Sequence, residues 1–194
     1  MKKVLLLVFP QYADFELGHP LFVLRKIGEA QITTVSADGA NVESLGGMKT
    51  QVDGKAADFN AENFDLVLIP GGDDIDLVLK ETTVITMLNQ AYESQVPVAS
   101  ICASATLLAK AGMLKGHDFT CMPGTYEHFN PLFEGARYSG APVEVGDTWI
   151  TAKGTAYAEF AIAIGEMLDL FDNEDHKQSI LHFCKGVVST EETA

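Results

Sequence analysis

The sequence is poor in basic residues and in cysteine, and it has no long hydrophobic run. It holds 13 lysine and arginine residues against 27 aspartate and glutamate residues, which gives a formal net charge of −14. Because phosphate backbones and anionic lipids repel such a chain, we expect no nucleic-acid partner and no membrane binding. Three cysteines without regular spacing argue against a disulfide framework, and no histidine, cysteine or carboxylate spacing indicates a metal. We therefore expect neither a metal nor another cofactor.

The first residues superficially resemble a secretory signal, because two lysines precede an apolar stretch. That stretch, from Val4 to Phe9, is too short for a signal and is closed by Pro10. No run of the sequence is long enough to cross a bilayer. We interpret the stretch as a first buried strand and expect a cytoplasmic protein folded as one domain over residues 1–194.

Short apolar runs alternate with amphipathic segments along the chain. Strands are predicted at Lys3–Phe9, Gln31–Ala37, Phe64–Ile69, Pro97–Cys102, Asp118–Cys121, Tyr138–Val145 and Thr148–Ala152, with a small hairpin between Gly39 and Lys55. Helices are predicted at Glu16–Ile27, Thr82–Ser94, Ala103–Ala111, Tyr157–Phe171 and Glu174–Cys184. Loop and turn are expected over Gly124–Gly135, and a frayed tail after Gly186. The alternation predicts an α/β fold with a mostly parallel, doubly wound sheet and helices on both faces.

Ligand sites of such sheets lie at the carboxyl ends of the strands. That rule selects the segment after Phe9, the glycine pair at the end of Pro70–Gly72, and Cys102. Cys102 lies where a buried strand runs into a helix, and small residues, Ser100 and Ser104, stand two positions to either side. This spacing is typical of a nucleophile elbow, whose tight turn leaves no room for bulky neighbours.

The elbow predicts a reactive thiol. A helix N-terminus favours the thiolate, so we expect a lowered pKa for Cys102. The backbone N–H of Ala103 is the first candidate to donate to an oxyanion, and that of Gly72 is the second. The alternative is that Cys102 is only a small buried apolar residue, which is the role we expect for Cys121 and Cys184.

Glu16 is the second residue that the pattern singles out. It follows the first strand by a short loop, so we expect it at the same edge of the sheet as Cys102. If the two meet, a protonated carboxyl donating to a thiolate avoids two adjacent negative charges. The alternative is an exposed glutamate at a helix start. Among five histidines, His19 and His128 are the candidates for a base that reaches the site, and otherwise they belong to the surface or the packing.

Four segments together carry a family resemblance that covers nearly the whole chain. They are Ala13-Asp14-Phe15-Glu16, Leu68-Ile69-Pro70-Gly71-Gly72, Ala99-Ser100-Ile101-Cys102-Ala103, and Thr151-Ala152-Lys153-Gly154 followed by Glu159-Phe160-Ala161. With them the chain resembles the ThiJ/PfpI superfamily, the DJ-one family, which is related to class I glutamine amidotransferases. The resemblance implies a flavodoxin-like three-layer sandwich, usually a homodimer. It also implies that Cys102 is the reactive cysteine, Glu16 its protonated partner, and Gly72 and Ala103 the oxyanion donors.

The superfamily includes cofactor-independent glyoxalases, proposed protein deglycases, redox-responsive chaperones and cysteine peptidases. Glyoxalase-type members have a histidine before a proline where this sequence has Met122-Pro123. Peptidase-type members have a histidine directly after the nucleophile, where this sequence has Ala103. The histidine and glutamate pair of the amidotransferases is also not reproduced by His182-Phe183-Cys184.

We expect Cys102 to act on small electrophiles such as 2-oxoaldehydes or their protein adducts, in the manner of a glyoxalase or deglycase. One alternative is a redox-sensing or chaperone-like stress protein with little turnover, and another is a cysteine peptidase or amidase. General acid–base help is typically worth about 10²–10⁴-fold in rate, so the absent family histidine leaves turnover dependent on a substitute base. The choice depends on how Cys102, Glu16 and the imidazoles are arranged.

Overall fold

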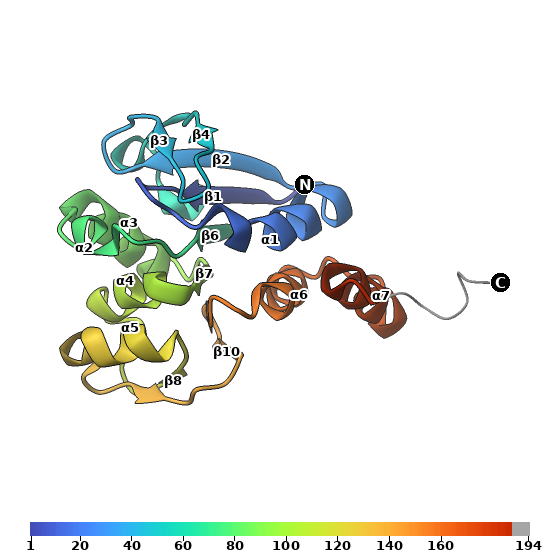
Figure 1. The fold of residues 1–194 in the computed structure, drawn as a ribbon. Coiled ribbons are helices and arrows are strands. Elements are labelled where there is room, and N and C mark those ends of the chain that lie inside the picture. The colour runs from blue at the N-terminus through green and yellow to red at the C-terminus, as the bar shows by residue number, and fades with distance from the viewer. Residues whose placement is uncertain (188–194) are drawn as a thin grey trace.

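The computed structural model describes residues 1–187, and its centre is a seven-stranded sheet (Figure 1). The strand order is β10-β11-β7-β6-β1-β2-β5, and the pairs are parallel except for β10 with β11. The strands are β1 (Lys3–Leu7), β2 (Gln31–Ser36), β5 (Gly54–Lys55), β6 (Leu66–Ile69), β7 (Val98–Ile101), β10 (Val143–Val145) and β11 (Trp149–Ala152). Strands β6, β7 and β11 are fully buried, because helices cover both faces of the sheet.

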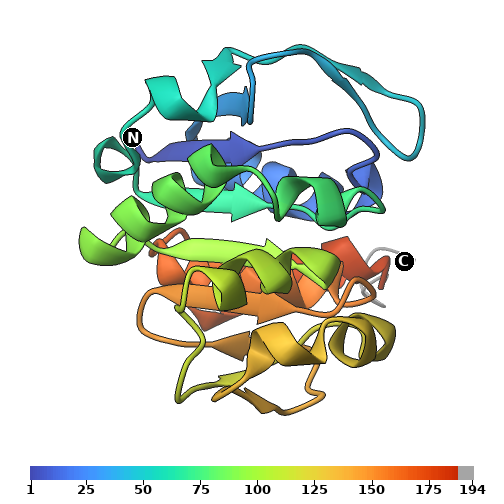
Figure 2. The same ribbon diagram turned by 90° about the vertical axis from the view of Figure 1, so that its left-hand side faces the viewer.

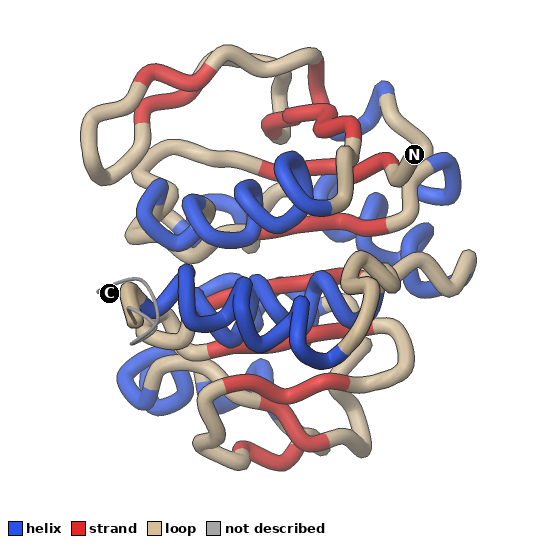
Figure 3. The backbone as a smooth tube through the Cα atoms, turned by 90° about the vertical axis from the view of Figure 1, so that its right-hand side faces the viewer, coloured by secondary structure: helices blue, strands red, loops and turns tan. Residues whose placement is uncertain are grey.

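Helices cover both faces of this sheet (Figures 1, 2 and 3). One face carries α2 (Ile75–Val78), α3 (Thr82–Glu93) and α4 (Ala105–Lys110); the other carries α1 (Gly18–Phe22) and α6 (Tyr157–Met167), with α7 (Glu174–Lys185) packed on α6. Beyond the two ends of the sheet lie the pairs β3 (Val42–Glu43) with β4 (Lys49–Thr50) and β8 (Asp118–Phe119) with β9 (Arg137–Tyr138), the latter beside α5 (Pro123–His128). This three-layer arrangement confirms the predicted flavodoxin-like α/β class.

Three sequence-based assignments are wrong in detail. The helix predicted over Glu16–Ile27 is a 3-10 turn, the short helix α1 and a π-helical turn, Val23–Ile27. The loop predicted over Gly124–Gly135 holds α5 and a 3-10 turn, because Pro123 occupies the first helical position, where its missing N–H costs nothing. The strand predicted over Tyr138–Val145 is split between β9 and β10, since Gly140 takes a φ of 69° between them.

Other boundaries differ less. The hairpin predicted between Gly39 and Lys55 is confirmed, with Val42 opposite Thr50. Helix α2 was not predicted, and α6 ends four residues before the predicted end. The tail predicted to fray falls, beyond position 187, outside the described residues.

Two kinds of feature are not found in residues 1–187. None of the helices there is long and apolar enough to span a bilayer. Nor does that part of the chain gather three metal-binding side chains at one point.

Candidate active site

Four parallel strands bring distant segments together at one edge of the sheet. Strands β1, β6, β7 and β11 run in the same direction, so the segments that follow them meet at their carboxyl ends. Glu16 follows β1, Gly71 and Gly72 follow β6, Cys102 follows β7, and Gly154 follows β11. The three places selected from the sequence therefore lie together, and the end of β11 joins them.

Cys102 sits on a strained turn. Its φ is +61°, in the left-handed region that residues other than glycine rarely adopt. The neighbouring Ser104 fixes this turn, because its Oγ accepts the Ile101 N–H at 3.0 Å and lies 3.1 Å from the Ile69 carbonyl oxygen at the end of β6. A sharp turn from strand to helix with a nucleophilic residue at its apex is the geometry of a nucleophile elbow.

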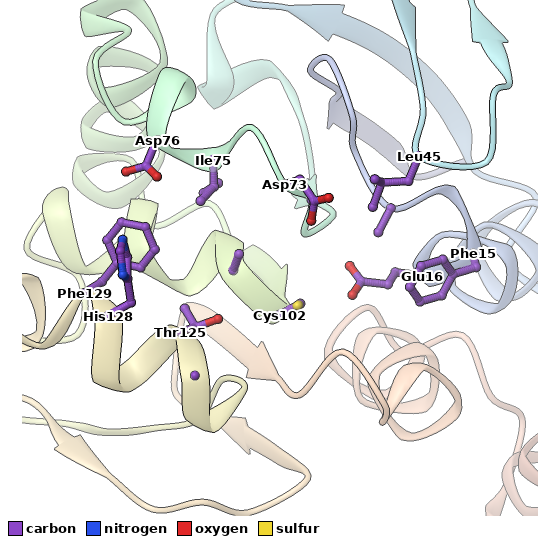
Figure 4. A pocket seen from close by; sticks show the side chains of 14 residues that line it. Phe15, Glu16, Leu45, Asp73, Ile75, Asp76, Cys102, Thr125, His128 and Phe129 are labelled. Carbon is purple, nitrogen blue, oxygen red and sulfur yellow. The ribbon is translucent and has the colours of Figure 1, made fainter.

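Glu16 lies against the thiol of Cys102, and the two side chains point toward each other (Figure 4). Glu16 is only 1% exposed, so it is not the exposed glutamate of the alternative interpretation. The backbone N–H of Gly71 donates to its Oε2 at 2.7 Å, and Cys102 hydrogen-bonds the same carboxyl group. Residues 86 positions apart in sequence thus form one buried pair.

The surroundings set the protonation of this pair. Burial raises the pKa of Glu16 to about 7, against the hydrogen bonds from Gly71 and Cys102, which lower it. Burial first, and then the Glu16 charge, raise the pKa of Cys102 to about 12, although the Ala103 N–H lowers it. The lowered pKa expected from a helix N-terminus is therefore wrong: the thiol is partly buried, a carboxylate is adjacent, and the following turn is a three-residue 3-10 turn. Above about pH 7, Glu16 is a carboxylate facing a neutral thiol.

Two glycines leave room for the pair. A Cβ placed on Gly71 would lie 2.6 Å from the Cys102 Cβ and 2.8 Å from the Glu16 Oε2. A Cβ placed on Gly154 would lie 2.7 Å from the Glu16 Oε1 and 2.9 Å from the Cys102 Sγ. Neither position admits a larger side chain without moving the carboxyl group or the thiol.

The two residues expected to supply oxyanion donors, Gly72 and Ala103, line the same cavity as Cys102. The Ala103 N–H donates a hydrogen bond to the Cys102 sulfur. Gly72 forms an isolated antiparallel β-bridge with Tyr12, and the residues that flank the two make its hydrogen bonds. The Ala13 N–H donates to the Gly71 carbonyl, and the Asp73 N–H donates to the Gln11 carbonyl. The Gly72 N–H therefore has no acceptor among the described residues and remains available to a ligand.

The pair opens into a cavity of about 370 Å³. Its walls include Glu16, Gly72, Asp73, Cys102, His128 and Phe129. His128 is thus in the cavity, on α5 beside Phe129 and away from the thiol (Figure 4). His19 is not in its wall: its ring stacks on Tyr157 with centroids 5.3 Å apart.

The structure also places Met122 and the other two cysteines relative to the site. Met122, which replaces the histidine of glyoxalase-type proteins, is the N-cap of α5 and does not line the cavity. Cys121 is buried, as expected, but it lies close enough to Cys102 to contribute to the raised pKa of that thiol. Cys184 is buried on α7, away from the cavity.

Sequence reasoning missed Gly154 and the cavity residues Asp73, Asp76 and Phe129 as parts of the site. A signal for Gly154 was present, because it follows a buried strand, β11, that pairs in parallel with β7. The same rule that selected Gly72 and Cys102 would have selected it. Phe129 gave no such signal, since the helix α5 that it directly follows was not predicted.

Comparison with known proteins agrees with this fold. The model of the DJ-1/PfpI family matches residues 2–167. The uncharacterized protease YdeA of Bacillus subtilis (strain 168) is 31% identical over 196 residues, which cover 95% of each chain. The deglycase PH1704 of Pyrococcus horikoshii is 27% identical over 151 residues, covering 78% of this chain and 89% of that one. Among solved structures, the DJ-1 superfamily protein Atu0886 from Agrobacterium tumefaciens superposes with a TM-score of 0.83 at 23% identity, covering 96% of this chain and 99% of that one.

Proposed function

The chain belongs to the DJ-1/PfpI family, and from this premise we propose that Cys102 attacks small electrophiles such as 2-oxoaldehydes or their adducts on proteins. The activity would be that of a cofactor-independent glyoxalase or deglycase. Relatives named as deglycases, at 27% identity, support a reaction of this class. The observation that carries the proposal is the buried pair of Cys102 and Glu16, at the wall of a cavity of about 370 Å³.

Glu16 supplies the proton transfer that the reaction needs. A general base works best when its pKa is near the working pH, and burial raises the pKa of Glu16 to about 7. The carboxylate takes the thiol proton as the sulfur attacks, so Cys102 needs no low pKa of its own. His128 is exposed and lies away from the thiol, so Glu16 is the better placed base.

The proposed reaction begins when the sulfur of Cys102 bonds to the aldehyde carbon and the thiol proton moves to Glu16. The carbonyl oxygen becomes an oxyanion beside the N–H groups of Gly72 and Ala103, and protonation gives a hemithioacetal. Glu16 then moves the hydrogen of that carbon, as a proton, to the neighbouring carbonyl carbon, which leaves a thioester. Water cleaves the thioester, releases a 2-hydroxy acid and restores the thiol, so the net reaction adds one water without an external oxidant.

The test is conversion of methylglyoxal to lactate by the purified protein and its variants. We expect Cys102→Ser to abolish turnover and Glu16→Gln to lower kcat by about 10²-fold or more, the typical size of general acid–base help. Cys184→Ser is the matched cysteine control and should keep the wild-type rate. In the wild type the rate should rise with pH through about 7, as Glu16 loses its proton. A Cys102→Ser protein that consumes methylglyoxal as fast as the wild type contradicts the proposal, and a comparable loss in His128→Gln transfers the base role to His128.

The two alternative functions have less support in this geometry. Redox sensing favours an exposed thiolate of low pKa, whereas burial raises the pKa of Cys102. A peptidase of the Cys–His type needs an imidazole beside the thiol, and Cys102 has no histidine partner within residues 1–187, although a relative at 31% identity is named a protease. Mass spectrometry after mild peroxide tests the redox alternative, which requires oxidation of Cys102 before Cys121 and Cys184.

A further inference from the structure

The cavity above Cys102 is lined by acidic groups and carries no fixed positive charge. Asp73 and Asp76 lie in its wall together with Glu16 (Figure 4). None of the wall residues found within residues 1–187 is a lysine or an arginine. A ligand that reaches the thiol must therefore pass close to carboxylates, with no lysine or arginine in the described wall to balance them.

The charges of Asp73 and Asp76 are not neutralised within the protein. Both side chains are exposed, and within the described residues neither carboxylate has a hydrogen-bond or ion-pair partner. Ile75, between them, is 3% exposed and anchors the start of α2 in the core, so the backbone that carries the two aspartates is fixed. Their charges are thus held at the cavity while they stay free to interact with a ligand.

Aromatic groups also line this cavity. Phe129 lies at the end of the cavity near Asp76, and Phe15 lies at the other end beside Glu16 (Figure 4). The face of an aromatic ring attracts cations such as ammonium and guanidinium groups. The carboxylates carry the preference for a positively charged ligand, and aromatic rings in the same wall are compatible with it.

We propose that Asp73 and Asp76 are specificity-determining residues that select cationic or neutral electrophiles for Cys102 and reject anionic ones. The proposal rests on the proposed function of Cys102 and deepens it by naming the substrate class. The matching ligands are electrophiles that carry a positive charge or no charge. Electrophiles that carry a carboxylate, sulfonate or phosphate group are disfavoured.

The sharpest test uses reagents of one reaction type that differ in charge. Aminoethyl, methyl and sulfonatoethyl methanethiosulfonate share one leaving group. In each case the Cys102 sulfur forms a disulfide with the reagent, methanesulfinate departs, and the thiol proton goes to Glu16 or to water. The rate of modification of Cys102 is followed by peptide mass spectrometry at pH 8. The rate with each charged reagent is divided by the rate with the neutral reagent, which removes differences in access.

The variant is Asp73→Asn with Asp76→Asn, and the matched control is Glu93→Gln with Asp147→Asn. The control removes the same charge from exposed positions just before β7 and β11 begin, at the opposite edge of the sheet. We expect the ratio of the aminoethyl to the sulfonatoethyl rate to fall by about tenfold at low salt in the cavity variant and to change by less than about twofold in the control. In the wild type, 0.5 M salt should remove most of the preference, because the Debye length is then about 4–5 Å.

An equal change in both double variants would overturn the proposal, because the preference would then reflect the net charge of −14. No change in the cavity variant would overturn it as well. Single variants at Asp73 and Asp76, checked by circular dichroism, keep the test valid if the double variant folds poorly. Turnover of methylglyoxal hemithioacetals with cysteamine, mercaptoethanol and mercaptopropionate then tests the proposed function separately: a charge preference without turnover contradicts the function and leaves the specificity standing.

Discussion

Above about pH 7 the Glu16 carboxyl group is ionised although it is buried, and this links the stability of the protein to pH. Its pKa is raised to about 7 by burial, whereas in an unfolded chain it would lie near 4.5. The folded state therefore binds the proton more tightly, and stability is lost as the pH rises from about 4.5 to about 7. We expect Glu16→Gln, which cannot ionise, to be more stable than the wild type above pH 7 by roughly 2–3 kcal/mol and to match it near pH 4.

Urea unfolding at a series of pH values measures this difference. Glu93→Gln, a substitution of the same type at an exposed position, should follow the wild-type curve at every pH and serves as the control. A Glu16→Gln protein that is less stable than the wild type at pH 8 would contradict the raised pKa, because the ionised carboxylate would then stabilise the fold.

Gly154 is the residue that leaves space for the reactive pair. A methyl group at this position would lie within 3 Å of both the Glu16 Oε1 and the Cys102 Sγ. Since Gly71 holds the other carboxyl oxygen at 2.7 Å, we expect Gly154→Ala to separate the thiol from its base. The rate of Cys102 modification by iodoacetamide should fall by about tenfold or more. The upper limit of the loss is the contribution of a general base to the rate, typically about 10²–10⁴-fold.

The matched control is Gly18→Ala, where a Cβ would meet nothing within 4 Å. Circular dichroism and the thermal midpoint show whether each variant folds. If Gly154→Ala reacts as fast as Gly18→Ala, the close approach at Gly154 has no part in the chemistry.

At the scale of elements, the elbow between β7 and α4 depends on one hydroxyl group. Ser104 accepts the Ile101 N–H and reaches the Ile69 carbonyl, so it connects the ends of two neighbouring strands in the core. Ser104→Ala leaves a buried N–H without its partner, which should cost about 1–3 kcal/mol of unfolding free energy. We also expect slower modification of Cys102, because the strained φ of that residue would relax.

Thr106→Val provides the comparison for this variant. Thr106 is also fully buried, and its hydroxyl donates to the Ala103 carbonyl at 2.6 Å, within the helix rather than between strands. Urea unfolding and the alkylation rate are measured for both variants. An elbow that reacts equally fast with and without the Ser104 hydroxyl would show that the turn is held by the backbone alone.

The helices and strands also show how much of the fold could be predicted from the sequence. Buried strands were predictable, because β6 is a continuous apolar run before a glycine pair and β7 is a mostly apolar run before a nucleophile. Irregular segments were not: α5 begins with Pro123-Gly124, which reads as a turn, and only tertiary packing makes it a helix. The elbow could be predicted from local spacing, but the direction of the Cys102 pKa could not, because it depends on burial and on Glu16. The homodimer and the cytoplasmic location stay predictions.

At the scale of the whole molecule, the net charge of −14 predicts how salt acts on stability. Ion pairs such as Arg137 with Asp118 and Lys55 with Asp58 are exposed, and pairs of this kind contribute little. Repulsion among unpaired carboxylates therefore outweighs attraction, and salt screens it. We expect the free energy of unfolding to rise by on the order of 1 kcal/mol between 20 and 300 mM sodium chloride, measured by urea unfolding at pH 7.5. The Glu93→Gln, Asp147→Asn double variant should gain less from salt, and a wild-type protein that salt destabilises would mean that its ion pairs outweigh the repulsion.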